Sequence, residues 1–168
     1  GRQVNLVELS VSHYLLARAL ESGDLAMTDV RTVNTADADI AAAYTSPDVT
    51  AAVAWNPQLL TMKQEPGTLQ VFSSADIPGE ILDLLVVDTA TLEANPDLGK
   101  ALVGIWYETL ALMQQDDEAG AAARAAMAQL AGTTPEMFEA QLATTHLYVE
   151  PGQAVAAATA DALVETMT

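Results

Sequence analysis

The chain has 168 residues, of which 6 are lysine or arginine and 23 are aspartate or glutamate, so its formal net charge is −17. A charge of this sign repels nucleic-acid phosphates and anionic lipid headgroups, which excludes polyanion binding. With 51% hydrophobic residues the chain is not disordered, and without cysteine it has neither thiol chemistry nor disulfides, so we expect one folded domain or two small lobes.

The first half of the chain alternates strand-like and helix-like segments. The expected strands are residues 4–9, 30–34, 50–55 and 69–72, and the expected helices between them are 13–22, 36–44 and 57–62. Ser10 or Ser12 is expected to cap the first helix, and Thr35 to cap the second. Asp37 and Asp39 then fall in the first turn of the second helix, where the helix dipole favours carboxylates. This alternation predicts a parallel sheet wound with right-handed crossovers.

The second half becomes helical after a single strand. That strand is expected at residues 81–87, and the helices at 96–113, 116–131, 135–143 and 155–167. One strand with four helices has no sheet of its own, so we expect this half to be incomplete and its partners to lie upstream. No apolar stretch approaches the roughly 20 residues that a membrane span needs.

The sequence lacks the common catalytic and cofactor motifs. It contains neither a phosphate-binding glycine loop nor an H-E-x-x-H or G-x-S-x-G motif. His13 and His146 lie on different elements, which disfavours a shared metal, and the acidic run 116–118 is typical of a solvated helix start. We therefore expect no enzyme, no cofactor and no metal site.

Polar and aromatic residues follow three of the expected parallel strands. In open parallel sheets, ligands bind in the crevice beyond the carboxyl ends of the strands. The residues expected to line this crevice are Glu8, Ser10, Ser12, His13, Trp55, Asn56 and Asp76. Each serine fits a plain helix cap as well, Trp55 fits core packing as well as a ligand wall, and His13 fits a surface histidine. Glu8, inside an apolar strand, needs a partner, because a buried unpaired charge is unfavourable.

Three segments carry a resemblance to a known family: VNLVELSVSHYLLARALESGDL, ADADIAAAYTSPDVTAAVAWNPQ and PGEILDLLVV with ANPDLGKALVGIWYETL. They resemble the substrate-binding proteins of nitrate/sulfonate/taurine-type ABC transporters, and most of all the branch associated with urea carboxylase. The resemblance implies an α/β fold of the periplasmic-binding-protein type 2, with a ligand held between two lobes. It implies that residues 1–75 are lobe two, with a wound and mostly parallel sheet. Residues 76–168 would then be the crossover strand and C-terminal helices of an incomplete lobe one, and the chain a C-terminal fragment.

Two residues depart from the wider family and bear on the solute. Glu8 stands where many members have a small or proline-like residue, and Asn56 where many have an acid. A carboxylate beside a helix N-terminus repels an oxyanion, which disfavours nitrate and sulfonate. We expect a nitrogen-rich solute, such as urea, a short amide or a guanidinium-like group, paired with Glu8 and with Glu80 or Asp83.

The resemblance also implies a partner and a location. The partner is the membrane permease of an ABC transporter, and the location is the periplasm or a lipid anchor outside the cytoplasmic membrane. The alternatives on the same two-lobe fold are a pyrimidine-precursor synthase and a ligand-sensing regulatory domain; a scaffold without a ligand is a third. Because the incomplete lobe leaves apolar surface uncovered, we expect the chain to self-associate through residues 81–87 or through the helices at 97–113 and 155–167.

Overall fold

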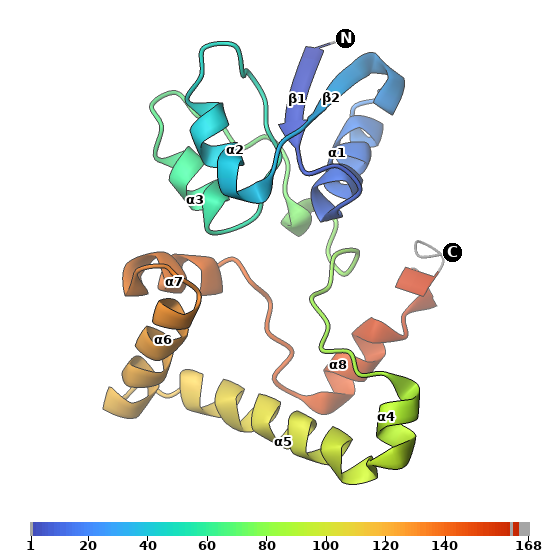
Figure 1. The fold of residues 1–168 in the computed structure, drawn as a ribbon, viewed down its shortest axis with the longest axis vertical. Helices are drawn as coiled ribbons and strands as arrows, with labels where there is room; N and C mark the ends of the chain where they lie inside the picture. Colours follow the sequence, from blue (N-terminus) through green and yellow to red (C-terminus); the bar gives the residue numbers. More distant parts are fainter. Residues whose placement is uncertain (1, 162, 165–168) are drawn as a thin grey trace. The chain divides into compact units, whose positions relative to one another are not determined.

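The computed structural model describes residues 2–161, 163 and 164 (Figure 1). The chain divides into two compact units, Gly1–Ile81 and Leu82–Thr168. This division lies a few residues after the boundary expected between residues 75 and 76. In the described residues the first unit is mixed α/β and the second is helical.

The first unit is built on two parallel strands, β1 (Arg2–Leu6) and β2 (Val30–Asn34) (Figure 1). Helix α1 (Val11–Ser22) and the 3-10 turn η1 (Met27–Asp29) connect them. A strand, a helix and a second parallel strand form the β-α-β unit that the alternating pattern predicts. The expected α/β class is therefore confirmed.

The third expected strand joins this sheet at a single point. The N–H of Asn5 donates to the carbonyl of Ala51 (3.0 Å), and the N–H of Val53 donates to the carbonyl of Asn5 (2.9 Å). These bonds make a parallel bridge between Asn5 and Ala52. Because alternate residues of a strand bond to opposite neighbours, β1 lies between β2 and the segment around Ala52.

The strands expected at residues 69–72 and 81–87 are wrong. Both stretches lie outside any strand, and in the first of them Leu69 and Val71 are 78% and 85% exposed. An apolar run forms a strand only where a neighbouring strand supplies hydrogen bonds. Neither stretch has such a neighbour among the described residues.

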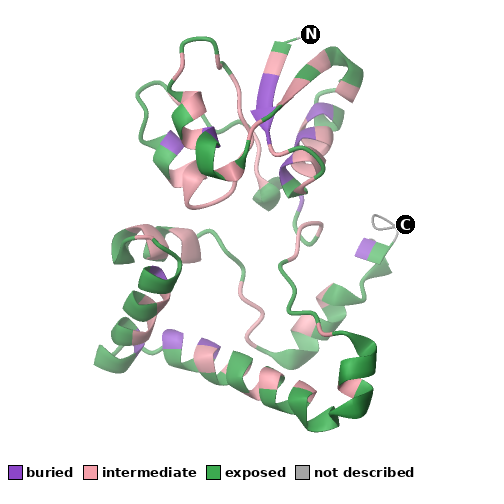
Figure 2. Ribbon diagram, viewed as in Figure 1, coloured by how far each residue is buried: buried purple, intermediate pink, exposed green. Residues whose placement is uncertain are grey.

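The core of the first unit lies between β1 and α1 (Figure 2). Val4 and Leu6 point to the same face of β1, and Leu16 and Leu20 to the same face of α1, because side chains repeat every two residues in a strand and every three or four in a helix. Leu6 is fully buried. The partly buried side chains packed against this cluster are Met27, Val30, Ala51 and Val53.

Two further helices, α2 (Asp37–Tyr44) and α3 (Gln58–Lys63), pack against each other in the first unit. Asp37 is in the first turn of α2, as expected, but Thr35 is not the cap. The cap position is Ala36, and the hydroxyl of Thr35 instead accepts from Asn5 Nδ2 (3.0 Å). Buried Asn5 thereby gains a partner beyond the sheet.

The second unit contains the helices α4 (Thr89–Ala94), α5 (Pro96–Met113), α6 (Glu118–Leu130), α7 (Pro135–Leu142) and α8 (Pro151–Ala158). The expected helices at 96–113, 116–131 and 135–143 are confirmed, and α4 was not expected. The last helix begins earlier than expected and is interrupted at residues 159 and 160; residues 161, 163 and 164 are helical again, and the rest of the expected range lies outside the described residues. Within the described part of the chain, no helix is long and apolar enough to span a bilayer.

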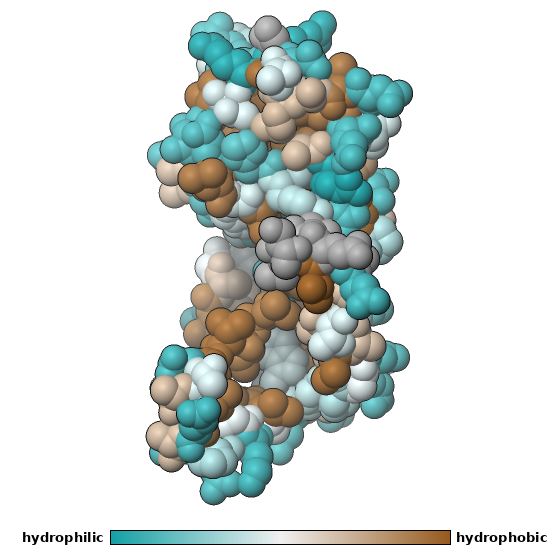
Figure 3. Space-filling view, turned by 90° about the vertical axis from the view of Figure 1, so that its right-hand side faces the viewer, coloured by the Kyte–Doolittle hydropathy of each residue, from teal (hydrophilic) through white to brown (hydrophobic). Residues whose placement is uncertain are grey.

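Arg124 joins three helices of this unit. Its Nε donates to Glu139 Oε1 on α7 (2.5 Å), and its Nη1 donates to the carbonyl of Met113 at the end of α5 (2.5 Å). Since Arg124 itself lies on α6, one guanidinium links α5, α6 and α7. The helices keep much apolar surface exposed, which Figure 3 shows as hydrophobic side chains gathered on the visible face of this unit.

Candidate functional site

The carboxyl ends of β1, β2 and the segment around Ala52 lie on the same side of the sheet, because all three run in the same direction. This side, where the strands end, is the carboxyl edge of the sheet. The loops that leave this edge contain most of the expected site residues. The common strand direction is thus confirmed. The meeting of all these side chains in one crevice stays a prediction.

The loop after β1 is attached to the end of β2. The N–H of Glu8 donates to Asn34 Oδ1 (3.0 Å), and the carboxylate of Glu8 accepts from the hydroxyl of Thr32 (2.6 Å). Because β1 ends at Leu6, Glu8 lies beyond the strand and is exposed. The expectation of a buried carboxylate inside the strand is therefore wrong, but its charge is accessible at the sheet edge.

The next three expected residues form the start of α1. Ser10 Oγ accepts from the N–H of Ser12 (3.1 Å) and donates to the carbonyl of Val7 (2.6 Å), so Ser10 is the cap. His13 Nδ1 accepts from the N–H of Leu9 (3.1 Å), whose φ of 59° places it in the left-handed region. Ser12 is buried at 3% exposure. Ser10 and His13 thus support the turn between β1 and α1.

The loop after Ala52 brings Trp55 and Asn56 to the same edge. Both are half-buried, and the carbonyl of Trp55 accepts from the N–H of Leu59 (2.8 Å), which begins α3. The peptide between Asn56 and Pro57 is cis. The side-chain oxygen of Asn56 is buried, and the described residues offer it no hydrogen-bond donor.

Two residues that the sequence analysis did not select lie at the same edge. Gln58 Nε2 donates to Asp37 Oδ2 (2.9 Å), which joins the start of α3 to the start of α2. Asp37 Oδ1 and Gln58 Oε1 are both buried, and neither has a donor in the described part of the chain. Each of the two residues follows an expected strand, and this position was the signal available in the sequence. For Asp37 the signal is not specific, because acidic residues are common in the first turn of any helix.

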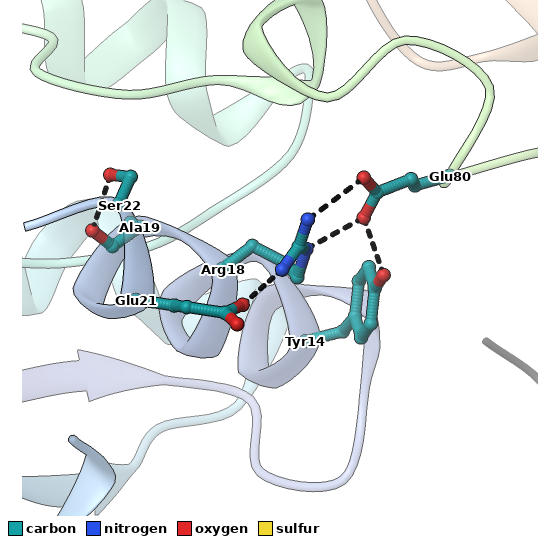
Figure 4. Close-up of polar contacts among 6 residues, drawn as sticks. All are labelled: Tyr14, Arg18, Ala19, Glu21, Ser22 and Glu80. Carbon is teal, nitrogen blue, oxygen red and sulfur yellow. Dashed lines mark hydrogen bonds and ion pairs between the residues drawn. The ribbon is translucent and has the colours of Figure 1, made fainter. Parts of the chain in front are cut away.

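Glu80 is paired within the first unit (Figure 4). Its Oε2 accepts from Arg18 Nε (2.7 Å) and from the hydroxyl of Tyr14 (2.5 Å), and its Oε1 accepts from Arg18 Nη2 (3.1 Å). The hydrogen bonds from Arg18 and then from Tyr14 hold the pKa of Glu80 below its ordinary value. Arg18, which also pairs with Glu21, has its pKa raised mainly by the bond to Glu80. Glu80 thus fastens the end of this unit to α1.

The remaining candidates lie elsewhere. Asp76 Oδ2 accepts from the N–H of Ser73 (2.7 Å) and stabilises the 3-10 turn η2 (Ser74–Asp76). Asp83 belongs to the second unit. The ring of His146 packs edge-on against Tyr148, with ring centres 4.7 Å apart. Among the described residues there is no cluster of three histidine, aspartate or glutamate side chains that could hold a metal ion.

Comparison with known proteins places this geometry in a family context. Residues 1–119 match the model of a family described as NMT1/THI5 like. Two solved structures are similar over 99% of this chain: the alkanesulfonate-binding protein SsuA from Xanthomonas axonopodis pv. citri bound to MOPS (TM-score 0.66, 20% identity) and the periplasmic aliphatic sulphonate-binding protein SsuA from Escherichia coli (TM-score 0.69, 22% identity). No curated protein sequence matches the chain.

These similarities establish the fold, an α/β arrangement like that of the two SsuA proteins. The chain spans 58% of the length of each of them. At 20% and 22% identity the solute of those proteins does not carry over to this chain.

Proposed function

The chain belongs to the NMT1/THI5-like family, and from this premise we propose that it is the solute-binding component of an ABC importer for a small nitrogen-rich solute. Urea, a short amide and a guanidinium-like cation are the members of that class. The fold supports the solute-binding role, because both similar structures are of solute-binding proteins. The carboxyl edge of a parallel sheet is also where such folds bind ligands.

The observation that carries the choice of solute is the exposed carboxylate of Glu8 at the sheet edge. In the described residues it receives one hydrogen bond, from Thr32, so lone pairs of this carboxylate are free for a ligand. An alkanesulfonate is an anion and needs hydrogen-bond donors, whereas a carboxylate repels it. A planar group with several N–H donors instead pairs with a carboxylate through two parallel bonds.

The role of the two units follows the family resemblance. We propose that residues 1–75 correspond to lobe two, and residues 76–168 to the crossover segment and helices of lobe one. The solute would be held between the lobes of the whole protein, because a small ligand reaches useful affinity only when most of its surface is enclosed.

A membrane permease and a periplasmic location belong to the same proposal. One of the two similar proteins is described as periplasmic, which supports the location. We expect the solute-loaded protein, and not the solute-free protein, to stimulate ATP hydrolysis by the reconstituted transporter.

A thermal-shift screen tests the solute class. A ligand that binds only the native state raises the melting temperature through mass action. Urea, guanidinium, acetamide, nitrate and taurine are compared at equal concentrations, and we expect one of the first three to give the largest increase. A larger increase with nitrate or taurine than with any nitrogen-rich compound would overturn the argument from Glu8.

A further inference from the structure

We propose that Asp37, Asn56 and Gln58 form a subsite for a protonated nitrogen group, either ammonium or guanidinium, of the bound solute. This inference rests on the proposed function and narrows the solute class to its cationic members. The three residues come from two places at the sheet edge: Asp37 starts α2 just after β2, and Asn56 and Gln58 enter α3 after the segment around Ala52.

A hydrogen bond holds two of these residues together. Gln58 Nε2 donates to Asp37 Oδ2 (2.9 Å), so the amide oxygen of Gln58, Oε1, takes no part in this bond. Asn56 is two positions before Gln58 in the turn that begins α3. The packing of α2 against α3 keeps the cluster in place.

All three side chains have an acceptor oxygen without a donor. Asp37 Oδ1, Asn56 Oδ1 and Gln58 Oε1 are buried, and no described residue donates to any of them. Buried polar atoms are nearly always hydrogen-bonded, so an unpaired acceptor oxygen on each of these three side chains is unusual in a folded unit. Each of them gains most from a partner that supplies N–H donors.

The charge of the cluster is also unbalanced. No described lysine or arginine forms an ion pair with Asp37; the ion pairs found in this unit join Arg18 to Glu80 and to Glu21. A partly buried carboxylate without a cation favours a ligand that brings positive charge. Three acceptors and one carboxylate therefore fit ammonium or guanidinium, and they oppose an anion such as sulfonate.

The test is an NMR titration of the 15N-labelled 168-residue chain, which detects weak binding as well as strong. The probe is methylguanidinium chloride, with urea as its neutral counterpart and sodium chloride as the ionic-strength control. We expect saturable shifts of the amide signals of Asp37, Asn56 and Gln58 with methylguanidinium. Urea should produce smaller shifts there, because it lacks the charge.

Variants separate the subsite from a general charge effect. Asp37→Asn should weaken methylguanidinium binding at least tenfold. Asp39→Asn is the matched control, because it removes the same charge from the same helical turn at an exposed position, and it should change the affinity less than twofold. Asn56→Asp adds a carboxylate to the cluster and should tighten binding, a result that a merely structural role would not give.

The outcomes distinguish this inference from the proposed function. Saturable shifts by any probe that leave Asp37, Asn56 and Gln58 unchanged would keep a solute-binding role and overturn the subsite. Equal weakening by Asp37→Asn and Asp39→Asn, or equal affinity for urea and methylguanidinium, would overturn the cationic subsite as well. The absence of saturable shifts with every probe would overturn the subsite, whereas the thermal-shift screen decides the proposed function separately.

Discussion

At the scale of single residues, Glu80 joins two distant parts of the first unit, because it binds Arg18 and Tyr14 across more than 60 positions of sequence. Its carboxylate is partly exposed, at 23% of the side-chain surface, so water screens part of the attraction. The two bonds from Arg18 are parallel, and this geometry makes the pair stronger than a single-contact surface ion pair.

The pH dependence of stability tests this pair. Because the folded state lowers the pKa of Glu80, its stabilising contribution is present above the unfolded-state pKa and is lost as the pH falls through the folded-state pKa. Glu80→Gln should lower the free energy of unfolding by about 1 kcal/mol at neutral pH and flatten the loss of stability in acid. Thermal unfolding followed by circular dichroism between neutral pH and acid measures both.

Glu21→Gln is the control for that experiment, since Glu21 is more exposed and also contacts Arg18. It should change stability less than Glu80→Gln does. Equal effects of the two variants would mean that the contact between Glu80 and α1 adds nothing beyond surface charge.

Glu8 belongs to the same scale and bears on solute binding. In the intact protein, Glu8→Gln should weaken a guanidinium-like solute by about 1 kcal/mol, because it replaces a charged acceptor with a neutral one at an exposed position. Isothermal titration calorimetry gives the change in affinity. Glu65→Gln, an exposed position just after α3, removes the same charge and should leave the affinity unchanged, so a matching loss there would indicate long-range electrostatics alone.

At the scale of elements, β1 is the centre of the first unit. It pairs with β2 on one side and with the segment around Ala52 on the other, and its Val4 and Leu6 form the core with α1. Its pairing with β2 and with the segment around Ala52 places the loops after these strands at the carboxyl edge of the sheet. The candidate site therefore depends on the stability of this strand.

Leu6→Ala should lower the free energy of unfolding by about 3 kcal/mol, because it opens a cavity at a fully buried position. Leu9→Ala makes the same chemical change three residues later, where the side chain is 95% exposed. It should leave the free energy of unfolding nearly unchanged. Thermal unfolding of both variants at one pH provides the comparison. A small effect of Leu6→Ala would show that the core lies elsewhere.

At the scale of the whole molecule, the second unit combines strong local helix signals with exposed apolar side chains. Residues 84–86 are apolar and exposed at 54%, 58% and 78%, and they do not lie in a strand. On α5, Val103, Ile105 and Trp106 are also exposed. Exposed apolar surface of this kind favours association with another chain.

We expect the 168-residue chain to self-associate, and multi-angle light scattering over a dilution series measures its mass. Val86→Asp should shift the equilibrium toward monomer, because a carboxylate is costly to bury in an apolar interface. Val71→Asp is the matched control, since Val71 is similarly exposed (85%) in the first unit. A stable monomer at every concentration would contradict the expectation, and an equal effect of the two variants would exclude residues 84–86 as the interface.

The sequence by itself determined the features that depend on near neighbours. Ser10 caps α1, Thr134 and Pro135 begin α7, and Asn95 and Pro96 begin α5, because capping and proline geometry act within one helical turn. The alternation of β1, α1 and β2 also follows from local periodicity. So does the parallel direction, since alternating strands and helices predict a parallel sheet.

The tertiary structure decided the features that depend on a distant partner. Residues 69–72 and 81–87 have strand-like composition, but no neighbouring strand among the described residues bonds to them. The contacts of Glu80 with Arg18 and of Gln58 with Asp37 likewise join segments far apart in the chain. Hydrogen bonds and ion pairs between such segments form only when the chain folds, so periodicity and capping signals, which are local, do not predict them.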